Sequence, residues 1–172
     1  MIEWFYFPQS LEPPSLARAV VSAFEKVESD IASPKNTLDS NGVLLKVRPE
    51  LEALGFTVET GKKKAEKITV PVLYGRNGKP AKSFDTDAYH VQGKFVLEVE
   101  AGRAVSNNQF LKDLFQACLM VDVDYLGIAV RRVYEAGSAT GKDFETVVTF
   151  FETLQASRRL ELPLKGVLIL GY

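Results

Sequence analysis

Four acidic side chains occur at alternate positions on the two sides of a short turn signal. Asp85 and Asp87 precede Gln92-Gly93, and Glu98 and Glu100 follow it. If Gln92-Gly93 is the turn of a β-hairpin, Asp87 lies opposite Glu98, and Asp85 lies opposite Glu100. Since side chains alternate between the two faces of a strand, all four acids then share one face. The pattern therefore predicts a cluster of carboxylate oxygens.

Carboxylates that face each other across a hairpin are unfavourable in an ordinary sheet. Each opposed pair costs about 0.2–1 kcal/mol, and more where water is excluded. A bound divalent cation would remove this repulsion, whereas the alternative interpretation is a solvated acidic strand face. The chain has one histidine and one cysteine, which excludes a disulfide framework and the common zinc sites. Asp85 is also typical of a turn or cap residue.

Length and composition are those of a compact globular protein. The 172 residues fit a single domain, 1–172. A net charge of −1 argues against a broadly basic surface, so any contact with nucleic acid would be local. The aromatic N-terminal stretch is too short for a signal peptide, and no apolar run is long enough to span a bilayer. We therefore expect a soluble, cytoplasmic protein.

The hydrophobic pattern around the acidic hairpin predicts both helices and strands. Helices are expected from Ser15 to near Ser33, from Ser40 to Gly55, after a capping-box spacing at Ser106–Gln109, and through Phe144 and Leu154. Strands are expected at 56–60, 68–74, 125–130 and 166–171. These elements would surround the hairpin in an α/β domain.

The order of these elements carries a family resemblance. With Asp87 before a hairpin and Glu98-Val99-Glu100 on the next strand, the central half of the chain resembles the PD-(D/E)XK restriction-endonuclease-like nucleases. The resemblance implies an α/β fold with a mixed central β-sheet flanked by helices. Glu100 stands where the family usually has Lys, a departure found in the branch typified by the BamHI restriction enzyme. Residues 98–103, together with Asn107-Asn108 and the helix that leads to 122–124, also resemble a group of small uncharacterised bacterial proteins, a resemblance that carries no information on activity.

The resemblance also implies a cofactor and roles for the acids. Mg²⁺ or Mn²⁺ would be bound by Asp87 and Glu98, together with the Val99 carbonyl or water. Glu100 would hold or deprotonate the attacking water, or help to bind a second ion. Many members of the family add an acid from an upstream helix. Glu50 is our candidate because it borders the buried stripe of its helix, although most helical glutamates are simply exposed.

Basic residues near the hairpin are candidates for phosphate contacts. Arg103 would position a phosphate or pair with a nearby carboxylate. Lys62, Lys63 and Lys64 would contact nucleic acid or form a solvated loop. His90 falls on the face opposite the acids, close to Phe95, and is expected to be structural.

The predicted function is that of a divalent-metal-dependent endonuclease that hydrolyses phosphodiester bonds, with DNA as its partner. Because the chain is small, a homodimer or a partner protein would supply specificity. The competing hypothesis is a non-catalytic protein with a nuclease fold that binds nucleic acid or protein. Glu100 in place of Lys and the nearly balanced charge favour this alternative.

Overall fold

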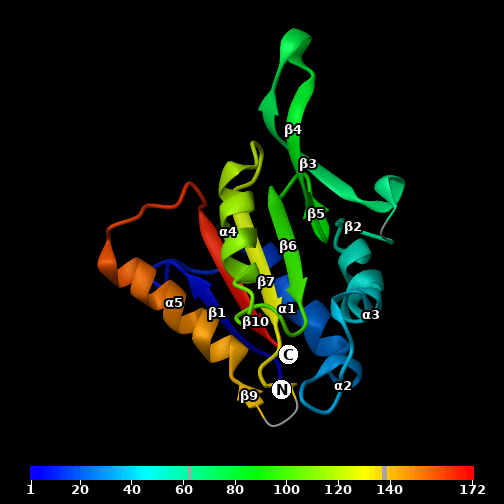
Figure 1. Ribbon diagram of the computed structural model, residues 1–172, viewed down its shortest axis with the longest axis vertical. Coiled ribbons are helices and arrows are strands. Elements are labelled where there is room, and N and C mark those ends of the chain that lie inside the picture. Colours follow the sequence, from blue (N-terminus) through cyan, green and yellow to red (C-terminus); the bar gives the residue numbers. More distant parts are fainter. Residues whose placement is uncertain (62, 137–138) are drawn as a thin grey trace.

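A six-stranded mixed β-sheet forms the centre of the protein (Figure 1). The computed structural model describes residues 1–61, 63–136 and 139–172. The strand order is β1-β10-β7-β6-β5-β2, in which β10, β7 and β6 run parallel and the outer strands pair antiparallel. Their bounds are β1 Glu3–Phe7, β2 Thr57–Val58, β5 Ala88–His90, β6 Phe95–Glu100, β7 Tyr125–Val130 and β10 Gly166–Gly171.

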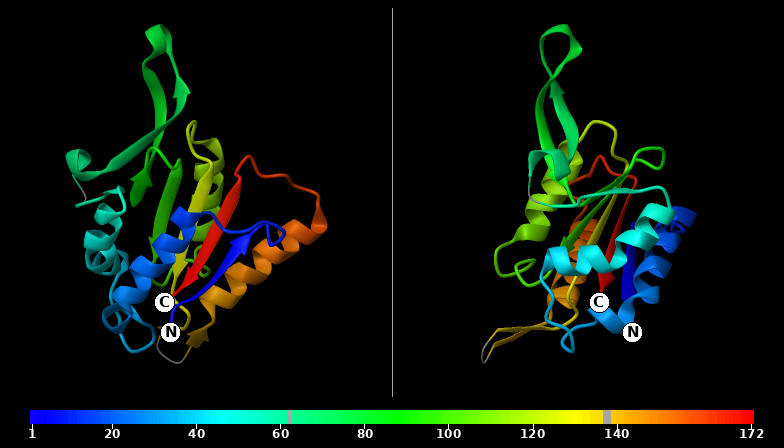
Figure 2. Two further views of the ribbon diagram at one scale, coloured as in Figure 1. Left: turned by 180° about the vertical axis from the view of Figure 1, so that it is seen from behind. Right: turned by 90° about the vertical axis from the view of Figure 1, so that its right-hand side faces the viewer.

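Helices cover both faces of this sheet (Figure 2). On one face lie α1, Ser15–Lys26, and α3, Ser40–Ala53, joined by the short α2, Glu28–Ile31. On the other face lie α4, Gln109–Leu119, and α5, Asp143–Ser157. Each layer buries its own apolar core against the sheet. Among the described residues, no helix is long and apolar enough to cross a membrane.

Local sequence explains how the helices begin and which side they bury. In α1, apolar residues at the 3–4-residue spacing of one helical face are buried, including Val20 and Phe24. The side chain of Asp39 caps α3 by accepting a hydrogen bond from the Gly42 amide, 2.8 Å. The predicted capping box before α4 is wrong: Asn108 is the N-cap, in a left-handed conformation, and no side chain caps that end.

A long two-stranded arm projects from the sheet (Figure 1). It consists of β3, Ile68–Tyr74, and β4, Pro80–Thr86, which pair only with each other. Short 3-10 turns precede the arm at Lys64–Glu66 and form its tip at Arg76–Gly78. A second small ribbon, β8 (Tyr134–Ala136) and β9 (Ala139–Gly141), lies at the opposite end of the molecule.

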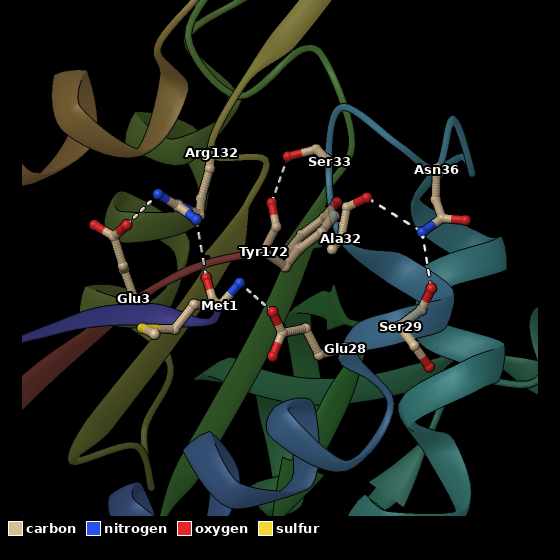
Figure 3. Close-up of polar contacts among 9 residues, drawn as sticks. All are labelled: Met1, Glu3, Glu28, Ser29, Ala32, Ser33, Asn36, Arg132 and Tyr172. Carbon is tan, nitrogen blue, oxygen red and sulfur yellow. Dashed lines mark hydrogen bonds and ion pairs between the residues drawn. The ribbon is translucent and has the colours of Figure 1, made fainter.

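Polar contacts tie both ends of the chain to the loops below the sheet (Figure 3). Arg132 forms an ion pair with Glu3 and donates a hydrogen bond to the Met1 carbonyl. The Ser33 hydroxyl donates to the carbonyl of Tyr172. The Tyr172 hydroxyl in turn donates to the carbonyl of Glu100, 3.1 Å. Through this last contact, the C-terminal residue holds the end of β6 that carries Glu100.

Candidate active site

The antiparallel pairing of β5 and β6 brings Asp87 beside Glu98. Ala88 pairs with Leu97 and His90 with Phe95. One position beyond Ala88 in this register, Asp87 lies opposite Glu98, as the sequence predicts. The connecting turn covers residues 91–94, and the Lys94 amide donates to the Val91 carbonyl. Asp87 is held further by the Val99 amide, which donates to its Oδ2 atom over 2.8 Å. Two carboxylates therefore meet at the end of the hairpin.

The alternation of β6 turns Glu98 and Glu100 toward α4. Leu97 and Val99 belong to the core under α1 and α3, whereas Val96 belongs to the core under α4 and α5. Because alternate residues share a face, Glu98 and Glu100 lie on the same side as Val96. Glu98 is only 9% exposed. The strand therefore brings carboxylates into a face that would otherwise be apolar.

A further carboxylate, Asp113, reaches this cluster from α4. It lies on the inward stripe of the helix with Phe110, Leu114 and Ala117, and it is 2% exposed. Its Oδ1 atom is 3.5 Å from the ammonium group of Lys112. Its Oδ2 atom is buried without a hydrogen-bond partner. A buried carboxylate oxygen without a partner is costly, so this atom is suited to a cation or a proton.

The environment raises the pKa of all four carboxyl groups. Burial raises the pKa of Asp87 to about 6 against the opposing effect of the Val99 hydrogen bond, and the charges of Glu59 and Asp113 add to the shift. Burial, followed by repulsion from Asp87 and Asp113, raises the pKa of Glu98.

The other two carboxyl groups respond in the same way. Burial, followed by repulsion from Asp113 and Asp87, raises the pKa of Glu100 to about 7. Burial raises the pKa of Asp113 to about 6, and the nearby Lys112 opposes the shift. The raised pKa values indicate that the nearby cations do not compensate for the negative charge of the four ionised carboxylates.

Glu59, which is buried, and Lys67, which is partly buried, form an ion pair next to Asp87. The Glu59 amide donates to the Asp87 carbonyl, 2.8 Å, which places Glu59 beside Asp87 on the next strand position. Both Glu59 carboxylate oxygens accept from the Lys67 ammonium group, at 2.7 and 2.8 Å. This hydrogen bond raises the pKa of Lys67. Lys67 is therefore already neutralised by a partner rather than available to the acids of the cluster.

A polar cavity of about 540 Å³ adjoins the cluster, and Asp87, Glu98 and Glu100 line it. Residues 83–87 of the arm and β5 line one wall, and Gln109, Lys112 and Gln116 of α4 line another. Glu59, Lys67, Glu98 and Glu100 also line it. Exposed Arg103 stands at its edge. A cavity that combines buried carboxylates with cationic side chains at the edge can hold a cation and an anionic ligand together.

The other residues singled out in the sequence lie in different places. Glu50 does not line the cavity and pairs instead with Lys26 of α1, over 2.5 Å. Asp85 lines the cavity but is exposed, and it pairs with Thr69 of the arm rather than with Glu100. Lys63 and Lys64 are exposed before the arm and do not line the cavity. Lys62 lies outside the described residues.

His90 has a structural position, as expected. Its ring contacts that of Phe56 at 5.2 Å between centroids, and its Nδ1 atom accepts from the Gly93 amide. It therefore stabilises the hairpin turn on the face away from the acids.

Two residues of the site were missed in the sequence. Asp113 had a usable signal, because a carboxylate at i+3 from Phe110 falls within the apolar stripe of an amphipathic helix. Glu59 had no such signal, because its position beside Asp87 depends on the pairing of β2 with β5, which are far apart in the chain.

Comparison with known proteins gives a fold and no closer relationship. No protein-family model matches the chain, and no curated protein matches it by sequence. The structure is similar to that of the restriction endonuclease BglII in complex with a DNA 16-mer, with a TM-score of 0.57 and 15% identity over 99% of this chain and 75% of that one. Free BglII gives a TM-score of 0.50 and 12% identity, over 99% of this chain and 78% of BglII. The mixed sheet flanked by helices is therefore the restriction-endonuclease fold, as the sequence predicted.

Proposed function

We propose that this chain is a single nuclease domain that hydrolyses phosphodiester bonds in DNA and requires Mg²⁺ or Mn²⁺. The observation that carries the proposal is the meeting of Asp87, Glu98 and Glu100 in one polar cavity of a restriction-endonuclease fold, with the buried carboxylate of Asp113 close enough to repel them. Burial and mutual repulsion make four neighbouring carboxylates destabilising for the fold alone. Their oxygen atoms are, however, suitable ligands for a hard cation.

The residues fit such an ion. The Val99 amide fixes the Oδ2 atom of Asp87, the described residues donate no hydrogen bond to its Oδ1 atom, and Glu98 presents its carboxylate from the adjoining strand. The partnerless Oδ2 atom of Asp113 supplies a further buried acceptor. Among the described residues, no three ligating side chains already form a ready metal site. The carboxylates would therefore have to draw together around the ion when it binds.

Each side chain has a separate role in the proposed reaction. Asp87 and Glu98 would hold the metal, which when bound supplies Lewis-acid polarisation of the phosphate and a more acidic water. Glu100 would accept the proton of the attacking water, and its pKa of about 7 suits a base that works near neutral pH. Arg103 at the edge of the cavity would position the phosphate.

The direct test is cleavage of plasmid, linear duplex DNA, single-stranded DNA and RNA with Mg²⁺, with Mn²⁺ and with EDTA. We expect metal-dependent cleavage by the wild type, and a loss of at least about 100-fold in Asp87→Asn and in Glu98→Gln because each removes a metal ligand. Asp122→Asn is the matched control, since Asp122 is exposed and pairs with Lys94 outside the cavity.

Calorimetric titration of Mg²⁺ separates the two functional hypotheses. Metal binding that is lost in Asp87→Asn, without cleavage of any substrate, would support a non-catalytic binding protein. Cleavage that survives in both cavity variants would contradict the assignment of the site.

A further inference from the structure

Positive charge is concentrated in one segment of this chain. Residues 61–84 contain seven of the 21 lysine and arginine residues and one of the 22 acidic residues. The segment thus carries a formal charge of +6, while the rest of the chain carries −7 against a total of −1. Most of this segment is the β3–β4 arm and its approach. A nearly neutral protein therefore has a strongly basic projection.

The arm is anchored at its base and stands free beyond it. Val70 is buried, and Val72 and Phe84 pack partly against the core under α4. The Val121 amide donates to the Pro71 carbonyl, 3.0 Å, and fixes the base. Beyond this point the side chains are open to solvent, with Leu73 61% exposed. The distal arm is a ribbon that the rest of the chain does not cover (Figures 1 and 2).

Among the described residues, the cations of the distal arm have no acidic partner. Arg76 and Lys79 lie at the tip and Lys82 on β4, all exposed. Within the described part of the chain, none of the three has a carboxylate within ion-pair distance, although many other cations do, such as Lys26 with Glu50 and Arg48 with Glu52. The ammonium group of Lys82 lies 5.3 Å above the Phe84 ring. The charge of the arm is therefore uncompensated by the protein itself.

The arm leads directly into the acidic cavity. Residues 83–86 at the end of β4 line the cavity, and the next residue is Asp87. A ligand that lies along the cations of the arm would reach the carboxylate cluster at its base. Such a ligand must be long and repeatedly negative, which describes a nucleic-acid backbone.

We propose that the β3–β4 arm binds the phosphate backbone of duplex DNA through Arg76, Lys79 and Lys82, and that it delivers the duplex to the cavity. The inference deepens the proposed function and rests on it. Seven-residue strands give a ribbon of about 20 Å, and a two-stranded ribbon fits the major groove, which is about 12 Å wide. Exposed Tyr74 beside the cations can contact the sugar or base edges.

The test compares two triple variants that each remove three exposed cations. The arm variant is Arg76→Ala, Lys79→Ala, Lys82→Ala. The control variant is Lys35→Ala, Lys142→Ala, Arg159→Ala, whose residues are exposed, have no ion-pair partner among the described residues, and lie outside the arm. Affinity for a fluorescent duplex is measured by anisotropy in Ca²⁺ over a series of salt concentrations, with single-stranded DNA and duplex RNA as further probes.

We expect the arm variant to bind duplex DNA at least about tenfold more weakly than the wild type near physiological salt. The magnitude of the slope of log affinity against log salt should fall by about 2 to 3, because each lost phosphate contact means that roughly one counterion fewer is released from the DNA on binding. The control variant should lose much less of both. Lys79→Arg with Lys82→Arg should keep the affinity, because the charge remains.

Three outcomes would overturn the inference. The first is equal duplex affinity in the arm and control variants, and the second is no binding of duplex DNA by the wild type. The third is self-association through the arm, seen as a dimer that Tyr74→Ala dissociates while duplex affinity is unchanged. The proposed function fails separately: wild type that binds duplex through the arm but cleaves nothing in Mg²⁺ keeps the inference and loses the activity. Equal cleavage by both triple variants would keep the proposed activity and overturn the inference about the arm.

Discussion

At the scale of single residues, the carboxyl cluster should make the metal-free protein less stable as pH rises. In the folded state the pKa of Glu100 rises from its ordinary 4.5 to about 7, and those of Asp87 and Asp113 rise from 3.8 to about 6. A raised pKa means that the folded state binds more protons, so stability is lost as pH increases through this interval. We expect the free energy of unfolding in EDTA to fall by about 1–3 kcal/mol between pH 4.5 and 7.5, measured by urea unfolding.

Two substitutions locate the origin of this slope. Asp113→Asn should flatten it and raise stability at pH 7.5 in EDTA, and the gain should shrink in Mg²⁺, where the cation performs the same neutralisation. Asp143→Asn is the matched control, because Asp143 is also buried with a partnerless oxygen but, unlike Asp113, does not contribute to the pKa shifts of Asp87, Glu98 and Glu100. Its effect should be the same with and without Mg²⁺. A slope that Asp113→Asn leaves unchanged would show that the cluster does not control it.

The sequence located some acids of the site and not others, for a physical reason. Asp87 and Glu98 belong to one hairpin, whose register follows from a turn and a strand period within about a dozen residues. Asp113 and Glu59 join the site only through the packing of α4 on the sheet and the pairing of β2 with β5. The apolar stripe of α4 marks Asp113 as an unusual inward-facing acid, but which site it joins depends on the whole fold and on no local pattern.

At the scale of elements, the main departure from expectation is the path of the strand that carries Asp85. The sequence predicts that it extends the hairpin and places Asp85 opposite Glu100. In the structure the pairing with β6 begins only at Ala88, and the residues before Asp87 form β4, which pairs with β3, so that Thr69 lies opposite Asp85. The alternation of 68–74 correctly indicates a strand, but it does not indicate the partner. When a strand sequence suits two pairing partners equally, packing against the core determines which partner it takes. Here the pairing that forms buries Val70.

The exposed distal arm should be dispensable for folding. Replacement of residues 73–81 by a two-residue Asn-Gly turn removes side chains that are mostly open to solvent, so Tm should change by less than about 3 °C. Val70→Ala should lower stability by about 1–2.5 kcal/mol, because it leaves a cavity at the buried base. Thermal unfolding followed by circular dichroism measures both. A fall of Tm by about 10 °C in the shortened protein would mean that the arm is part of the cooperative core.

At the scale of the whole molecule, the two kinds of charge are separated along one path. The arm has an excess of cations, whereas Asp87, Glu98 and Glu100 line the cavity at its base and the buried Asp113 lies close to them. Phosphate would thus be attracted by the arm and repelled by the cavity until a divalent cation is bound. The near-neutral total conceals this arrangement, because net charge indicates only that any contact with nucleic acid is local and does not locate it.

This separation predicts that the cavity weakens DNA binding in the absence of metal. Asp87→Asn combined with Glu98→Gln removes the negative charge that these groups carry above their raised pKa values. At such a pH the variant should bind duplex DNA in EDTA at least about tenfold more tightly than the wild type, because like charges no longer meet. The wild type should make a similar gain when Ca²⁺ is added, and the variant should not. Asp122→Asn with Glu161→Gln removes the same charge from exposed positions outside the cavity and should change affinity little. If both double variants gained equally, the effect would come from net charge, and the cavity would not be where phosphate meets the protein.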